Sequence, residues 1–236
     1  GSRDASWLGW DGGAAVPERV RGLDARLVGV ALSRTEVDAH YHGFANRTLW
    51  PLLHGLVEHY ALEHRWWECY RSVNGRFAAA LADEVERGDG PAGVWIHDYH
   101  LALVPARLRE LAPQVPSLFF LHVPFPPPEV WERLPWGMQL LHGLLSADVV
   151  AFQSRAFRDN MRACALQSGL ATPLDDETVR HEDRTVRLVA HPIGIDAARV
   201  EREAASPGVQ ARLGALRQRF AGRRVLLGVD RLDYTK

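Results

Sequence analysis

Short apolar runs alternate with longer amphipathic patterns along most of this chain, and this alternation limits the fold more than any other feature. The apolar runs are continuous, which is typical of strands buried on both faces of a parallel sheet. They lie at residues 26–32, 93–97, 117–122, 148–152, 185–189 and 224–229. Strands that alternate with helices predict an α/β fold with a doubly wound, mostly parallel, Rossmann-like sheet.

Helical patterns occupy the segments between the apolar runs. Ser33 and Glu36 form a capping-box pattern that starts a helix toward Tyr41. Apolar residues recur at helical spacing over residues 65–87. Residues 171–184 have no periodicity and predict a surface loop. Further helices are predicted at residues 46–57, 101–112, 136–145, 154–168 and 207–220.

The amino-acid composition limits the kinds of molecule that this chain is expected to bind. The chain has 28 basic and 29 acidic residues, and this balance favours neither nucleic acid nor an anionic membrane as partner. No segment has the apolar length of a membrane span or of a signal peptide. Cys69 and Cys164 are too far apart for a CxxC motif and indicate a reducing compartment. We therefore expect a cytoplasmic protein with small-molecule partners; the sequence leaves homo-oligomer formation open.

Polar groups follow the predicted strands, where an open α/β sheet binds its ligands. His97, Asp98 and His100 follow the second apolar run, and His122 follows the third. Two interpretations compete for the first group: a metal cluster, or a site that hydrogen-bonds a sugar. Because no second carboxylate cluster lies nearby, the sugar site is favoured. His122 alone could equally be a hydrogen-bonded core histidine.

Other candidate residues lie further from these strand ends. Arg231 follows the last apolar run, and by itself it could form a surface ion pair with Asp233. Trp10, Tyr41 and Trp50 flank predicted loops, where aromatic rings with polar tips can bind a sugar or its phosphate.

Seven motifs occur in order over essentially the whole chain: WLGW (7–10), YxxFxNxxLW (41–50), VWIHDYH (94–100), FLHVPFP (120–126), ADxxxFQ (147–153), PIGID (192–196) and GVDRLDYxK (228–236). Together they resemble the trehalose-6-phosphate synthases, a family of retaining glycosyltransferases with the two-domain GT-B fold.

The resemblance implies transfer of glucose from a nucleotide-glucose, with UDP-glucose expected, to glucose 6-phosphate, giving α,α-trehalose 6-phosphate. It implies no metal, and we expect no cofactor. It assigns Asp98 to the acceptor and His122 to the donor glucose. It assigns Arg231 and Lys236 to the donor diphosphate, and these four residues are the expected catalytic residues. It also places Trp10, Tyr41 and Trp50 around the acceptor phosphate.

The chain departs from the family pattern at both ends and at Gly137, where members often have a basic residue. We expect residues 1–198 to be the acceptor-binding N-terminal domain without its first strand and Gly-rich loop. Residues 199–236 would be a linker helix and the start of the nucleotide-sugar domain. Such a fragment should be inactive by itself. Three alternatives stay open: a glucosylglycerol-phosphate synthase or related pseudo-glycosyltransferase, a non-catalytic regulatory paralogue, and a metal hydrolase using His97, Asp98 and His100.

Overall fold

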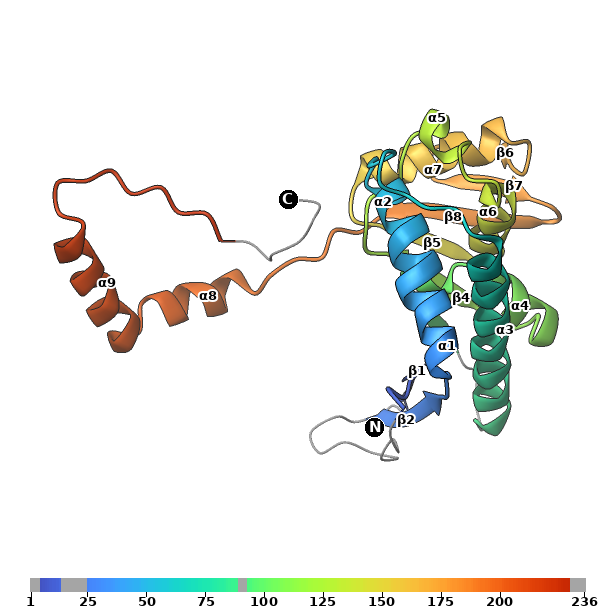
Figure 1. Cartoon of the computed structure of the whole chain (residues 1–236), viewed down its shortest axis with the longest axis horizontal. Coiled ribbons are helices and arrows are strands. Elements are labelled where there is room, and N and C mark those ends of the chain that lie inside the picture. The colour runs from blue at the N-terminus through green and yellow to red at the C-terminus, as the bar shows by residue number, and fades with distance from the viewer. Residues whose placement is uncertain (1–4, 14–24, 89–92, 230–236) are drawn as a thin grey trace. The chain divides into compact units, whose positions relative to one another are not determined.

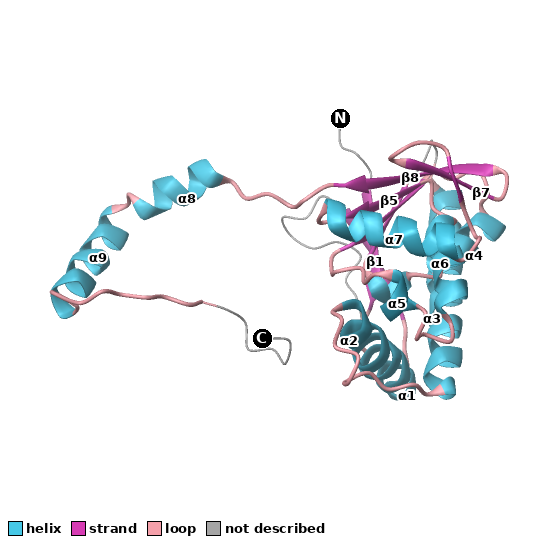
Figure 2. Cartoon of the chain, turned by 90° about the horizontal axis from the view of Figure 1, so that it is seen from above, coloured by secondary structure: helices cyan, strands magenta, loops and turns pink. Residues whose placement is uncertain are grey.

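The structure is a computed structural model that describes residues 5–13, 25–88 and 93–229. Contacts between residues divide the chain into two compact units, Gly1–Pro192 and Ile193–Lys236. The first unit contains the sheets and most of the helices (Figures 1 and 2). The predicted binding residues that the structure describes all lie in this first unit.

Four parallel strands form the main part of a six-stranded sheet in the first unit. They are neighbours in the order β3-β4-β5-β8, and each adjacent pair is parallel. Their bounds are β3 Val94–His97, β4 Ser117–Leu121, β5 Val149–Phe152 and β8 Arg184–Ala190. Phe119 lies opposite Ile96 on one side and Val150 on the other. The prediction of an α/β fold with a mostly parallel sheet is confirmed.

Two antiparallel strands extend this sheet beyond β8, and here the predicted surface loop at 171–184 is wrong. β7 (Thr178–His181) pairs with β8, and β6 (Thr172–Pro173) pairs with β7. Only Val179 and His181 are buried in β7. An alternation of buried and exposed residues over so few positions does not distinguish a strand from a polar loop in the sequence.

A separate two-stranded parallel sheet contains β1 (Ala5–Trp10) and β2 (Ala25–Val30). The strand predicted at 26–32 is therefore confirmed as β2, although it pairs with β1 and does not belong to the six-stranded sheet. β1 was not predicted as a strand. Its residues are exposed or half-buried, with Trp7 61% and Trp10 44% exposed, so it lacks the apolar pattern of a buried strand.

One continuous helical segment covers residues 34–53, where the sequence predicted two helices. It begins at α1 (Arg34–Glu36), continues as the π-helix η1 (Val37–Leu49) and ends as α2 (Trp50–Leu53). The Ser33 capping box is confirmed: Ser33 Oγ accepts the backbone N–H of Glu36 at 3.3 Å. Pro51 has no N–H to donate, and the carbonyl of Arg47 accepts from Ala61 N instead, at 2.8 Å. The helix therefore passes through a proline without an unpaired carbonyl at Arg47.

The connecting helices and one face of the six-stranded sheet share a single apolar core, which includes Phe119, Leu121 and Val150. The opposite face has a small cluster of strand residues, Phe120, Ala151 and Val189. When consecutive parallel strands are each added at the same edge of a sheet through right-handed crossovers, the helices that connect them lie on one face of the sheet. The helices are α3 (His64–Arg87), η2 (Tyr99–Leu101), α4 (Val104–Leu111), α5 (Pro128–Trp131), α6 (Gly137–Leu145) and α7 (Arg155–Gln167).

The second unit has two described helices, α8 (Ala197–Ala204) and α9 (Pro207–Arg219). α9 confirms the helix predicted at 207–220. The strand predicted at 224–229 is wrong, because these residues are irregular and Leu226 is 91% exposed. A buried strand needs neighbours for its backbone groups, and the described residues 193–229 contain no other strand.

Candidate functional site

The carboxyl ends of β3, β4 and β5 bring polar side chains together at one edge of the sheet. Here we call His97, Asp98, His122 and Gln153 the sheet-edge site. His97 Nδ1 lies 2.9 Å from His122 Nε2, and Gln153 Nε2 lies 3.5 Å from His122 Nδ1. Asp98 Oδ1 accepts the backbone N–H of His122 at 3.2 Å. The predicted convergence of Asp98 with His122 is therefore present in the structure.

Asp98 has a backbone conformation that favours glycine, with φ 71° and ψ 165°. A non-glycine residue in this region costs on the order of 1–3 kcal/mol. Its backbone N–H continues the parallel ladder by donating to the carbonyl of Phe120 at 2.8 Å. The chain then turns sharply into η2, and the Asp98 carboxylate lies against the end of β4. This turn places a carboxylate beside His122.

The two histidines of the site, His97 and His122, form a stacked pair. Their ring centroids are 5.3 Å apart, with an interplanar angle of 18°. Burial lowers the pKa of His97, and the neighbouring His122 lowers it further. A neutral imidazole offers one N–H donor and one lone pair. The pair can therefore hydrogen-bond uncharged hydroxyl groups such as those of a sugar.

A group of aromatic rings includes His100, two residues after Asp98. Trp10 lies 6.5 Å from Tyr41 between ring centroids, and Tyr41 stacks on His100 at 5.3 Å and 13°. We call Trp10, Tyr41 and His100 the aromatic cluster. Trp10 is the last residue of β1, and Tyr41 lies within η1. Trp50 is the first residue of α2, 5.8 Å from the ring of Tyr99. The expectation that these residues flank loops is confirmed for Trp10, which ends β1 before a turn, and is wrong for Tyr41 and Trp50, because helix 34–53 is continuous.

Two buried polar atoms beside the site have no hydrogen-bond partner within the described part of the chain. They are Trp50 Nε1 and His100 Nε2. Burial also lowers the pKa of His100, although Asp98 opposes this effect. Because a buried polar atom without a partner is destabilising, both atoms are candidates to contact a ligand.

A hydrogen-bond network that was not predicted from the sequence holds residues 99–103 beneath the site. The Tyr70 hydroxyl donates to the carbonyl of Tyr99 at 2.6 Å and accepts the N–H of Ala102 at 2.9 Å. Asn74, one turn later in α3, donates to the carbonyl of His100 and accepts the N–H of Leu103. Burial raises the pKa of Tyr70, so its hydroxyl remains a donor at any physiological pH. The only signal in the sequence was the (i, i+4) spacing of these residues.

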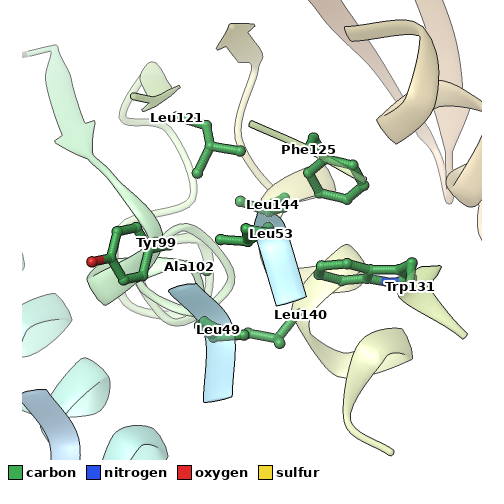
Figure 3. A pocket seen from close by; sticks show the side chains of 9 residues that line it. All are labelled: Leu49, Leu53, Tyr99, Ala102, Leu121, Phe125, Trp131, Leu140 and Leu144. Atoms are coloured by element: carbon green, nitrogen blue, oxygen red, sulfur yellow. The ribbon is translucent and has the colours of Figure 1, made fainter. Parts of the chain in front are cut away.

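A small cavity of about 20 Å³ lies in the core near the site (Figure 3). It is lined by apolar side chains such as Leu121 and Leu144 and by the ring of Tyr99. The Tyr99 hydroxyl points away from it and donates to Asn46 Oδ1 at 2.9 Å. This volume is about that of one water molecule. The cavity cannot hold a sugar.

The remaining predicted residues have different outcomes. Arg231 and Lys236 lie outside the described residues. Within the described residues, His97, Asp98 and His100 do not form a group of three side chains whose metal-ligating atoms lie close together.

A Cβ at Gly137 would lie 2.9 Å from Trp131 Nε1, so the basic residue expected from the family does not fit there without movement of Trp131. No described helix has both the length and the apolar character of a membrane span.

Comparison with known proteins decides the family. The model of glycosyltransferase family 20 matches residues 7–236. The chain belongs to this family. A trehalose-6-phosphate synthase of Mycobacterium sp. (strain JLS) is 40% identical over 244 residues, which cover 99% of this chain and 50% of that protein. This family 20 chain thus spans about half the length of that relative and of the similar synthase of Mycolicibacterium vanbaalenii.

Solved structures agree with this family 20 assignment. The crystal structure of a UDP-forming α,α-trehalose-phosphate synthase from Burkholderia xenovorans superposes with a TM-score of 0.82 at 31% identity, over 97% of this chain and 51% of that one. A Burkholderia xenovorans synthase in complex with glucose-6-phosphate gives a TM-score of 0.76 at 27% identity, over 89% and 48% of the two chains. These matches support a GT-B-type α/β domain for the first unit.

Proposed function

We propose that this chain is the acceptor-binding part of a trehalose-6-phosphate synthase. The reaction transfers glucose from UDP-glucose to glucose 6-phosphate and retains the anomeric configuration. The convergence of Asp98, His122 and the aromatic cluster at one sheet edge carries this proposal. The UDP-forming activity of one similar structure and the bound glucose-6-phosphate of another support the choice of donor and acceptor. Both substrates are metabolites of the cytoplasm, where we place the protein.

Asp98 binds hydroxyl groups of the acceptor sugar in this proposal. Its carboxylate keeps acceptor capacity beyond the N–H of His122, because an ionised carboxylate has about four lone-pair sites. The left-handed backbone of Asp98 aims this capacity at the sheet edge. His122 binds the donor glucose and is oriented by His97 and Gln153.

The acceptor phosphate lies against Trp10, Tyr41 and Trp50. The indole N–H of Trp50 is buried without a partner in the described chain, so a phosphate oxygen that accepts from it gains a hydrogen bond and satisfies a buried donor. The exposed edges of Trp10 and Tyr41 leave the phosphate accessible to solvent cations.

Arg231 and Lys236 hold the donor diphosphate. Cleavage of the sugar–phosphate bond builds negative charge on the leaving diphosphate and positive character on the sugar. Arg can bind the diphosphate through a bidentate fork and Lys as a point charge, so the pair stabilises the charge where it develops. The leaving phosphate then accepts the proton of the attacking hydroxyl on the same face, which gives retention.

The test uses the protein expressed from its whole reading frame. It is incubated with UDP-glucose and, in parallel, with glucose 6-phosphate, glucose or glycerol 3-phosphate, and released UDP and phosphorylated disaccharide are measured. We expect UDP release only with glucose 6-phosphate, together with trehalose 6-phosphate. Transfer to glycerol 3-phosphate would instead indicate a glucosylglycerol-phosphate synthase. No transfer to any acceptor by a folded protein would contradict the proposal.

A further inference from the structure

Three side chains with metal-ligating atoms meet at the opposite edge of the sheet from the proposed sugar site. They are His142 near the end of α6, His181 at the end of β7 and Glu182 in the turn before β8. α6 ends where β5 begins, and β7 ends where β8 begins, so the group lies at the amino ends of the parallel strands. The 7 residues of β8 span about 20 Å between this edge and the other.

The distances between the ligand atoms suit a single cation. His142 Nδ1 lies 3.1 Å from His181 Nε2. Two nitrogens bound to one zinc ion at about 2.0–2.1 Å, with a tetrahedral angle between them, are about 3.3 Å apart. One ligand atom from each of the three residues, a carboxylate oxygen in the case of Glu182, lies within 4.8 Å of the other two. The three groups need only small movements to share one ion.

The hydrogen bond on the far side of His181 fixes the ring in the form that binds metal. His181 Nδ1 lies 2.7 Å from the carbonyl oxygen of Leu170. Because a carbonyl only accepts, the proton lies on Nδ1, and the lone pair of Nε2 points at His142. Metal-binding histidines usually donate their other N–H to a carbonyl or carboxylate in this way. His181 is only 3% exposed, so its ring orientation is fixed by packing.

Two features supply negative charge to the same place. His142 lies in the last turn of α6, where the helix dipole favours a cation. Glu182 is exposed and contributes a carboxylate, although its φ of 53° is a backbone conformation that favours glycine. Two arginines flank His181 and Glu182 in sequence: Arg180 is exposed, and Arg184 pairs with Asp148, which Arg109 also contacts.

We propose that His142 Nδ1, His181 Nε2 and Glu182 bind one zinc ion. Two imidazoles and one carboxylate are a ligand set that zinc uses, and a water completes the tetrahedron on the exposed side. The ion joins α6 to the β7–β8 turn and stabilises the first unit. This site is independent of the proposed sugar chemistry, which uses the other edge of the sheet.

Zinc titration of the chelator-treated chain, with a chromogenic chelator as competitor, tests the proposal. We expect one equivalent to bind with a dissociation constant below about 10 µM, and Tm to rise by about 5–10 °C at a hundredfold excess of zinc over this constant. Cobalt(II) should give the intense visible absorption of a tetrahedral site. Ring ¹⁵N shifts of His142 and His181 should change on addition of zinc.

Variants distinguish this site from other histidines. His142→Gln should weaken zinc binding at least 100-fold and Glu182→Gln about 10-fold, while both metal-free variants keep the Tm of the parent chain. His59→Gln removes an exposed histidine and should leave binding unchanged. His122→Gln tests the other close histidine pair and should also leave it unchanged.

Three outcomes would overturn the proposal. They are the absence of saturable micromolar binding, unchanged binding in His142→Gln, and loss of binding in His122→Gln but not in His142→Gln. Glu182→Gln keeps the test decisive if His142→Gln fails to fold, because Glu182 is exposed.

Discussion

Replacement of Tyr70 by phenylalanine tests whether the network beneath the site holds the Asp98 turn. The ring of Tyr70 is fully buried and its packing would be kept, so the change removes only the hydroxyl. The carbonyl of Tyr99 then loses its donor and the N–H of Ala102 loses its acceptor. Each buried group left without a partner costs about 1–3 kcal/mol, and the two groups together predict a loss of about 2–6 kcal/mol in the free energy of unfolding.

Thermal and urea unfolding, followed by circular dichroism, measure this loss. For a domain of this size, Tm should fall by roughly 5–25 °C. Tyr60→Phe is the matched control, because Tyr60 is half-buried and its hydroxyl makes no hydrogen bond within the described part of the chain. It should change stability by less than about 0.5 kcal/mol. A Tyr70→Phe variant as stable as the Tyr60→Phe control would refute the reasoning.

Three further predictions concern pH, the phosphate pocket and the leaving group. Burial lowers the pKa of His40 to about 3, so between pH 6.5 and pH 3 the unfolded chain binds a proton on this side chain and the folded chain does not. The free energy of unfolding should therefore fall by about 1.4 kcal/mol for each unit by which the pH drops in this range. Urea titrations of His40→Leu should show a smaller dependence of the free energy of unfolding on pH. Tyr41→Phe combined with Trp50→Ala should weaken glucose 6-phosphate binding more than UDP-glucose binding in calorimetry; equal losses would argue against the pocket. Arg231→Ala or Lys236→Ala should reduce turnover on the order of 10²-fold or more without a change in Tm, and near-normal turnover would exclude that role.

The central strands were predictable because their signal is local. The runs that became β3, β4 and β5 are continuously apolar, the run that became β8 is interrupted only by Arg187, and polar residues bound each of them. The run at 224–229 has the same pattern, yet it is irregular, because a strand also needs neighbouring strands. The pattern of a segment therefore predicts that it can be a strand and does not predict that it has a partner.

The candidate site was predictable to the level of residue type and position. Its polar residues follow apolar runs, so His97, Asp98 and His122 could be placed at one sheet edge, and the structure brings them together. The assignment of Trp10, Tyr41 and Trp50 to a pocket depended on the family resemblance, and their roles stay predictions. Two features left no usable trace: the left-handed φ of Asp98, and the inward hydroxyl of Tyr70, which occupies an apolar position of α3.

Calorimetric titration of glucose 6-phosphate into the protein expressed from its whole reading frame, with and without Asp98→Asn, tests the central claim most directly. The variant keeps the size of the side chain and removes its charge. We predict that it binds glucose 6-phosphate at least 10-fold more weakly, since a hydrogen bond to a charged group contributes about 1.5–3 kcal/mol, while Tm changes little. Equal affinity of the two proteins for glucose 6-phosphate would contradict an acceptor site at the carboxyl ends of β3 and β4.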